Sequence, residues 1–255
     1  MAEAAWPLPY WIAHRGAGKL APENTLAAFR VGAGHGYRAF ECDVKLSADG
    51  VPFLLHDATL ERTTALRGLA GERSWSELSR VDAGSWHSPA YAGEPIPSFE
   101  AIAAFVRRNG HALDIEIKPT PGQELSTGRT VGLEVMRLWE GAQTLPLFTS
   151  FRPDALQGAL ETAPQVPRGL LLDTLWEGWE RAAATLGCAA VITNHKLMSA
   201  ELAGRLHGQG RRALVYTVND RDLAARMAGC GVDGIVTDAV DLFDPTAGAA
   251  APTTR

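Results

Sequence analysis

The stretch AAVITNHKLMSAELAGRLHGQGRRALVYTV, residues 189–218, contains one complete unit of the fold. Its apolar runs at Ala189–Thr193 and Ala213–Val218 have the length and composition of buried strands. Between them, Ser199 can cap the start of a helix that reads AELAGRLHGQG and closes at glycine. A strand, a helix and a second strand in this order predict two parallel strands joined by a crossover helix.

The same unit recurs along most of the chain. Helix-like segments follow the capping residues Ser98 and Asp220, and from Leu145 onward strands recur roughly every 20–25 residues. Successive strands with right-handed crossovers close most simply into a TIM (β/α)8 barrel, and 255 residues suit one such domain. The other candidate strands are Trp11–His14, Ala39–Leu46, Val51–His56, Leu113–Lys118, Leu145–Ser150, Gly169–Leu172 and Gly234–Thr237.

Nine candidate strands are one more than an eight-stranded barrel needs. The sequence SADG between Leu46 and Val51 has the composition of a tight hairpin turn. One of the two flanking runs is then not a parallel strand of the barrel. A turn at Ala48–Asp49 would place Glu41 opposite His56.

The segment 57–97 is longer than the helix expected after a strand, and it contains tryptophan, tyrosine and several glycines and prolines. We predict a small insertion that caps the barrel mouth, where loop elaborations commonly build substrate specificity. A structural excursion with no role in ligand binding is the alternative. The expected organisation is a single catalytic domain over residues 1–243 and a disordered tail over residues 244–255.

The composition limits the partners and the compartment. A net charge of −5 argues against a nucleic-acid-coating surface, which is normally basic. No export signal and no apolar stretch near 18 residues is evident, so we expect no membrane span and a cytoplasmic location. The three cysteines lack metal-site spacing and are expected to be reduced thiols. The oligomeric state stays open.

Polar residues gather where four candidate strands end, which is where the active sites of such barrels lie. In a strand, residues two apart point to the same face, so Glu41 and Asp43 project together, as do Glu116 and Lys118. Three converging carboxylates repel one another unless a cation sits between them, and oxygen ligands select a hard ion such as Mg²⁺ or Ca²⁺. A structural ion pair is the alternative, in which Lys118 merely balances the carboxylates.

Two histidines at strand ends, His14 and His56, suggest a general acid and a general base, because imidazole titrates near working pH. Arg15 can offer a bidentate fork to phosphate oxygens, or can form a salt bridge to one of the carboxylates. For His35, His111 and His207 we expect solvated or capping roles. His87 in the insertion and His195 after a strand end have the same default role, with substrate contact as the alternative.

Several motifs resemble the glycerophosphodiester phosphodiesterase family, and the resemblance extends from His14 to Asp238. They are AHRGAGKLAPENTLAAF, FECDVKLSADGVPFLLHDATLERTT, LDIEIKP, LVYTVND and GIVTD. Without an export signal, the chain resembles the bacterial cytoplasmic members. The resemblance implies a TIM barrel with an inserted region after the strand that carries His56. It also implies that Glu41, Asp43 and Glu116 are metal ligands. His14 and His56 would then be the acid–base pair, and Arg15 and Lys118 would bind the phosphate.

Four further residues follow from the resemblance with open alternatives. Glu23 and Asn24 would orient the residues that contact the metal and the substrate, although Asn24 is also placed to cap the helix that begins near Thr25. Tyr216 stands where the family often has tryptophan, so it keeps an aromatic face for glycerol and adds a hydroxyl. Phe151 would pack against the substrate or belong to the core.

The implied reaction is metal-dependent hydrolysis of a glycerophosphodiester to sn-glycerol 3-phosphate and an alcohol. One histidine would deprotonate a glycerol hydroxyl and the other would protonate the leaving alkoxide, through a cyclic phosphate. The partner is then a small molecule and the cofactor one divalent metal. Alternatives are a phospholipase-like enzyme acting on intact lipid, and a non-catalytic barrel that binds phosphate metabolites. The headgroup, the choice between Mg²⁺ and Ca²⁺, and which histidine is the acid stay open.

Overall fold

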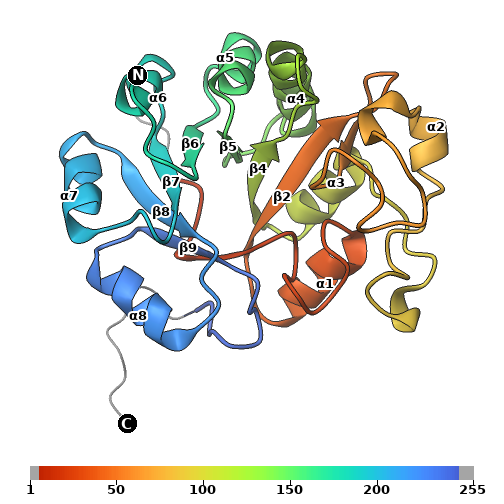
Figure 1. The fold of residues 1–255 in the computed structure, drawn as a ribbon, viewed down its shortest axis with the longest axis horizontal. Helices are drawn as coiled ribbons and strands as arrows, with labels where there is room; N and C mark the ends of the chain where they lie inside the picture. Colours follow the sequence, from red (N-terminus) through yellow and green to blue (C-terminus); the bar gives the residue numbers. More distant parts are fainter. Residues whose placement is uncertain (1–5, 247–255) are drawn as a thin grey trace.

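The computed structural model describes residues 6–246, in which parallel strands form a closed barrel surrounded by helices (Figure 1). The ring closes because β1 pairs with both β2 and β9. The predicted TIM barrel is confirmed. Within the described residues the eight parallel strands are β1 (Trp11–Ala13), β2 (Ala39–Leu46), β4 (Ala112–Ile117), β5 (Leu147–Ser150), β6 (Arg168–Leu172), β7 (Ala190–Asn194), β8 (Arg212–Tyr216) and β9 (Gly234–Thr237).

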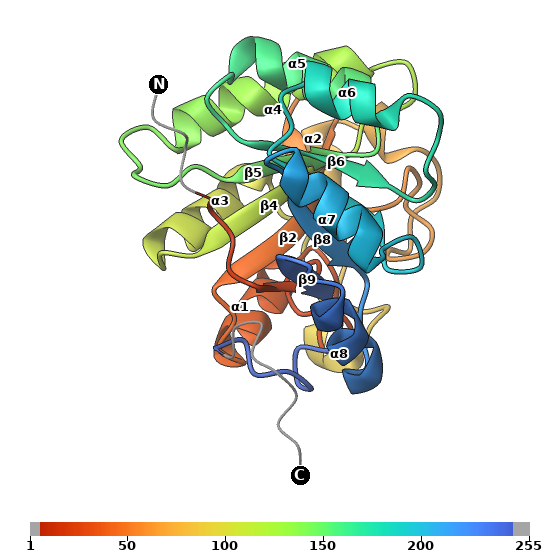
Figure 2. The same cartoon turned by 90° about the vertical axis from the view of Figure 1, so that its left-hand side faces the viewer.

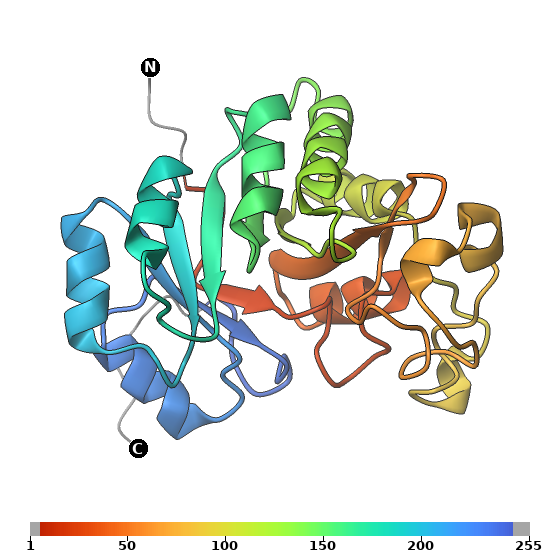
Figure 3. The ribbon, with the colours of Figure 1, turned by 45° about the horizontal axis from the view of Figure 1, so that its top comes forward.

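The crossover helices lie on the outer side of the ring (Figures 1 and 3), and α4 and α5 pack side by side (Figure 2). The predicted caps are present: the side chains of Ser98, Ser199 and Asp220 each accept a hydrogen bond from a backbone N–H in the first helical turn. The helices are α1 (Leu26–Gly34), α3 (Phe99–Arg108), α4 (Glu124–Leu138), α5 (Pro153–Thr162), α6 (Trp179–Thr185), α7 (Ala200–Gly208) and α8 (Arg221–Gly229).

Both faces of the barrel strands are buried, which explains why their sequences read as continuous apolar runs. All eight residues of β2 are buried. Phe40, Cys42 and Val44 belong to the apolar layer between strands and helices. The alternate residues Glu41 and Asp43 face the barrel interior, where an apolar cluster fills the rest of the space. Strand parity therefore brings charged side chains inside the barrel.

The surplus strand is β3 (Pro52–Leu54), which pairs antiparallel with β2 and lies outside the barrel ring. The predicted hairpin at SADG is present, but its predicted register is wrong by one residue. Val44 lies opposite Leu54, and the Leu55 N–H donates to the Asp43 carbonyl, so Glu41 is not opposite His56. The reason is a wider turn, closed by Ser47 and Val51, in which Gly50 has a φ of 79°.

The inserted segment between β3 and α3 lies beside the hairpin (Figure 1). It contains η1 (Ala70–Glu72), α2 (Trp75–Leu78) and η2 (Pro89–Tyr91). Buried side chains of this segment form an apolar cluster of their own with Phe53 and Leu55. Its role as a cap over the barrel mouth stays a prediction, as does the division into domains. Of the predicted disordered tail, residues 247–255 lie outside the described residues.

Within residues 6–246, no helix has the length and the apolar character needed to cross a membrane. The three cysteines are free thiols, as predicted: Cys42, Cys188 and Cys230.

Candidate active site

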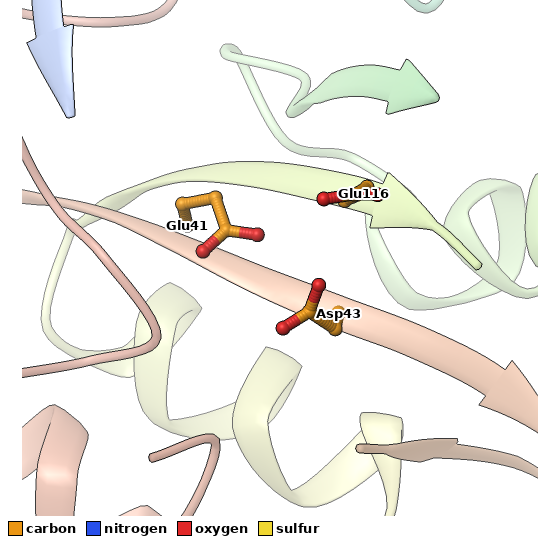
Figure 4. A group of neighbouring side chains, drawn as sticks. All are labelled: Glu41, Asp43 and Glu116. Carbon is orange, nitrogen blue, oxygen red and sulfur yellow. The ribbon is translucent and has the colours of Figure 1, made fainter. Parts of the chain in front are cut away.

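Three carboxylates meet inside the barrel, two from the middle of β2 and one from near the carboxyl end of β4 (Figure 4). Asp43 and Glu116 are direct neighbours in the register of the two strands, and Glu41 lies two residues before Asp43 on the same face. One oxygen from each of the three side chains lies within 4.8 Å of the others. The geometry therefore brings together the three residues predicted as metal ligands.

Burial and mutual repulsion shift the pKa values of the carboxylates in this cluster. Burial raises the pKa of Glu41 well above its ordinary value, and repulsion from Asp43 adds to the effect. Burial and the charge of Asp43 likewise raise the pKa of Glu116 to about 7. Burial also opposes ionisation of Asp43, but the charges of Lys118 and Arg15 hold its pKa below its usual range.

Two oxygens of the cluster have spare hydrogen-bonding capacity. Glu41 Oε1 and Asp43 Oδ1 are buried and accept no hydrogen bond, although Lys118 Nζ lies 3.4 Å from the latter. Buried acceptors without a donor are costly, and a cation would satisfy them. An all-oxygen set with mutual repulsion fits a hard divalent ion, so these residues could hold one.

The two predicted catalytic histidines each have a carboxylate at Nδ1. His14 Nδ1 lies 2.6 Å from Asp238 Oδ1, and His56 Nδ1 lies 2.6 Å from Asp57 Oδ1. A carboxylate in that position favours the tautomer protonated at Nδ1, which leaves Nε2 to exchange a proton. His14 Nε2 faces the acidic cluster, 3.7 Å from Glu41 Oε2. Burial lowers the pKa of His56, despite the nearby charge of Asp43.

Asp238 follows the end of β9 and is itself held by Asn219. The Asn219 side-chain amide donates to Asp238 Oδ2 at 2.9 Å, and the Asp238 N–H donates to Asn219 Oδ1 at 2.8 Å. The loop after His14 packs directly on Asp238: a Cβ at Gly18, whose φ is 55°, would lie 2.1 Å from Asp238 Cα. Our sequence predictions did not include Asp238, although the strand-end motif GIVTD placed it at the right edge of the barrel.

The two predicted phosphate-binding cations are paired with carboxylates. Arg15 has a φ of 51°, its N–H donates to Glu41 Oε2 at 3.1 Å, and its Nη1 donates to Glu23 Oε1 at 2.9 Å. Lys118 Nζ lies 2.9 Å from Glu116 Oε1 and 3.4 Å from Asp43 Oδ1. Both ion-pair alternatives raised by the sequence are therefore present, and both cations also line the pocket described below.

Asn24 holds Asp43 and does not cap the helix. Its amide donates to Asp43 Oδ2 at 2.7 Å, and its Oδ1 accepts the Asp43 N–H at 3.1 Å. The N-cap of α1 is Thr25, whose hydroxyl accepts from the N–H of Ala28. The capping prediction for Asn24 is wrong because the residue has a φ of 59°, which turns its side chain toward the acidic cluster.

A pocket of about 180 Å³ opens beside these groups. Phe151 and Tyr216 both line it, with their rings perpendicular and 5.8 Å apart, and the Tyr216 hydroxyl donates to the Leu172 carbonyl at 3.0 Å. One side of the pocket is charged and the other is mainly apolar. The charged side is formed by His14, Arg15, Glu41, His56, Asp114, Glu116 and Lys118, and the other side includes Phe151, Leu171, Ile192, Tyr216 and Val236.

Residues 14–242 match the glycerophosphoryl diester phosphodiesterase family. The chain belongs to this family.

Relatives of known name and structure agree with the family match. A glycerophosphodiester phosphodiesterase of Caldanaerobacter subterraneus subsp. tengcongensis is 31% identical, covering 89% of this chain and 93% of that protein. An Oleispira antarctica phosphodiesterase, solved with the product sn-glycerol-3-phosphate, is 31% identical with a TM-score of 0.85, covering 91% of this chain and 94% of that one. An Agrobacterium tumefaciens glycerophosphodiester phosphodiesterase is 29% identical with a TM-score of 0.79, covering 93% and 99%. The enzyme class predicted from the motifs is confirmed.

Other polar residues of this family member were not singled out by sequence reasoning. Asp114 and Thr149 line the pocket, and the Thr149 hydroxyl donates to Asp114 Oδ1 at 2.7 Å. Burial raises the pKa of Asp114 to about 7. The motif LDIEIKP contained the only sequence signal, since Asp114 has the same strand parity as Glu116. His87 and His195, which we considered for substrate contact, are not among the residues that line this pocket.

Proposed function

We propose that this protein is a divalent-metal-dependent hydrolase that converts glycerophosphodiesters into sn-glycerol 3-phosphate and an alcohol. The observation that carries the proposal is the joint presence, at one pocket, of two histidines that are each oriented by a carboxylate and of a three-carboxylate cluster. Two members of that cluster, Glu41 and Glu116, line the pocket, and Asp43 lies buried directly beside them. The Oleispira antarctica relative, with the product sn-glycerol-3-phosphate bound, supports the choice of substrate class.

Glu41, Asp43 and Glu116 would hold the metal, and either Mg²⁺ or Ca²⁺ suits their oxygen ligands. A cation held by these carboxylates would supply Lewis-acid stabilisation of the negative charge that develops in phosphoryl transfer. Asn24 keeps Asp43 in place by two hydrogen bonds, a type of support that commonly changes metal affinity when it is removed.

His14 and His56 carry the proton transfers. One histidine accepts the proton of a glycerol hydroxyl at Nε2 while that oxygen forms a bond to phosphorus. The other donates a proton to the alkoxide oxygen as its bond to phosphorus breaks. The cyclic phosphate is then opened by water with the two roles reversed. Each histidine contributes on the order of 10²–10⁴ in rate. Asp238 and Asp57 hold the two rings so that Nε2 is the reacting atom.

Arg15 and Lys118 stabilise the charge that develops on the phosphoryl oxygens, which is the usual main contribution in phosphoryl transfer. Phe151 and Tyr216 offer an aromatic surface to the glycerol carbons. The pocket volume of about 180 Å³ is below the range typical of sites for drug-sized ligands, which favours a small glycerophosphodiester over an intact lipid.

Turnover of a panel of glycerophosphodiesters, measured with Mg²⁺, with Ca²⁺ and after addition of a chelator, tests the proposal. We expect hydrolysis that the chelator abolishes, and losses of about 10²–10⁴ in kcat for His14→Ala and His56→Ala. Near-wild-type turnover by either variant would contradict the assignment. Hydrolysis of lipid micelles would indicate the phospholipase-like alternative, and binding without turnover would indicate a non-catalytic barrel. The cytoplasmic location stays a prediction.

A further inference from the structure

Arg62, in the inserted segment, forms bidentate hydrogen bonds with each of two carboxylates. Its Nε and Nη2 donate to Asp57 Oδ2 and Oδ1 at 2.6 and 3.1 Å. Its Nη1 and Nη2 donate to Glu23 Oε2 and Oε1 at 2.8 and 2.7 Å. Two bidentate contacts from one guanidinium fix both carboxylates in direction as well as in distance.

Each of these carboxylates in turn holds a residue that lines the pocket. Asp57 Oδ1 lies 2.6 Å from His56 Nδ1, and Glu23 Oε1 accepts from Arg15 Nη1 at 2.9 Å. The contacts therefore run without a break from His56 through Asp57, Arg62 and Glu23 to Arg15. Arg62 is the residue that joins the loop after β3 to the loop after β1.

We propose that Arg62 is a positioning residue that sets His56 and Arg15 relative to each other across the pocket. The proposal rests on the function proposed above, in which His56 transfers a proton and Arg15 stabilises the phosphoryl charge. It gives the inserted segment a part in catalysis through Arg62, without direct contact between that residue and the substrate.

The alternation of charge along these contacts supports this role. Hydrogen bonds from Arg62 hold the pKa of Asp57 at about 2, so Asp57 stays an anionic acceptor for His56. Glu23 lies between Arg62 and Arg15 and is only 13% exposed. Without Arg62, Glu23 would keep Arg15 as its partner and hold that guanidinium more strongly, away from a phosphate. Asp57 would lose both of the hydrogen bonds from Arg62 that fix the plane of its carboxylate.

Arg62→Gln removes the charge and the fork, and Arg62→Lys keeps the charge but cannot form two bidentate contacts. Arg73→Gln is the matched control: Arg73 lies in the same segment, its side chain is 42% exposed like that of Arg62, and it pairs with Glu77, which does not line the pocket. We would measure kcat, KM and the melting temperature of all three variants on glycerophosphocholine with the metal present.

We expect Arg62→Gln to lower kcat/KM by about 10- to 100-fold, because small displacements of reacting groups cost up to about 10² in rate. Both parameters should contribute, kcat through His56 and KM through Arg15, and Arg62→Lys should recover only part of the loss. Kinetic constants for Arg62→Gln equal to those of Arg73→Gln would overturn the proposal. Full recovery by Arg62→Lys would overturn it as well, because charge alone would then suffice. An inactive wild-type enzyme would instead contradict the proposed function.

Discussion

Replacement of Glu116 by glutamine should stabilise the metal-free protein at alkaline pH while it abolishes metal-dependent turnover. Glu116 lies beside Asp43 and is largely buried, with 12% of its side chain exposed, and these two causes raise its pKa from 4.5 to about 7 even though Lys118 Nζ lies 2.9 Å from its Oε1. Above about pH 7 the protein therefore holds an ionised carboxylate at a site that favours the neutral form. Glutamine keeps the shape of the side chain and removes the charge.

The direction of the pKa shift of Glu116 determines how its contribution to stability changes with pH. Since the folded-state pKa is raised, the contribution of Glu116 to stability is present in full below about pH 4.5 and is lost as the pH rises through about 7. A shift of about 2.5 pH units at about 1.4 kcal/mol per unit gives about 3 kcal/mol by pH 8. The free energy of unfolding of Glu116→Gln should therefore match that of the wild type at pH 4.5 and exceed it by about 3 kcal/mol at pH 8.

Urea unfolding of both proteins with a chelator, at intervals from pH 4.5 to 8, measures this difference. Glu100→Gln is the control, because Glu100 has a side chain that is 62% exposed and lies on the outer helix α3. The difference between wild type and this control should stay small at every pH. A Glu116→Gln variant no more stable than the wild type at pH 8 would refute the reasoning from burial and repulsion. Added Mg²⁺ or Ca²⁺ should stabilise the wild type more than the Glu116→Gln variant.

Two further predictions concern the support of His14. Asp238→Asn should lower kcat by at least about 10²-fold, because an amide at Nδ1 favours the wrong imidazole tautomer. Asp233→Asn is its control, since Asp233 pairs with a histidine outside the pocket, and equal kcat values for the two variants would contradict the prediction. Gly18→Ala should lower the free energy of unfolding by about 1–3 kcal/mol or more, because its Cβ would meet the Asp238 backbone at 2.1 Å. A thermal melt unchanged from the wild type would show that the loop adapts.

The barrel and the position of the acidic cluster could be predicted because both depend on local patterns. Apolar runs, capping residues and glycine stops mark the strands and helices within a few residues of their observed ends. The parity of a strand then places Glu41 and Asp43 on one face, and parallel strands bring that face beside Glu116. No contact between distant residues has to be guessed for this step.

The hydrogen bonds that hold the site residues in place could not be predicted in the same way. His14 and Asp238 are 224 positions apart and meet only because β1 and β9 close the ring. Asn24 matches a helix cap in its sequence, and although asparagine tolerates the positive φ that turns it toward Asp43, the residue type alone does not decide between the two roles. The one-residue error at the hairpin has a similar origin, because SADG indicates a turn without fixing its width.

In the structure, ion pairing and phosphate binding are compatible roles for Arg15 and Lys118. The sequence offered ion pairing or phosphate binding as separate roles, and the structure has both residues paired with carboxylates at the wall of the pocket. These ion pairs keep both cations at the wall of the pocket. A divalent ion among the same carboxylates would compete for their charge and loosen the hold on Lys118 and Arg15. In the proposed mechanism, ion pairing in the metal-free protein and phosphate binding in the working enzyme would be successive uses of one arrangement.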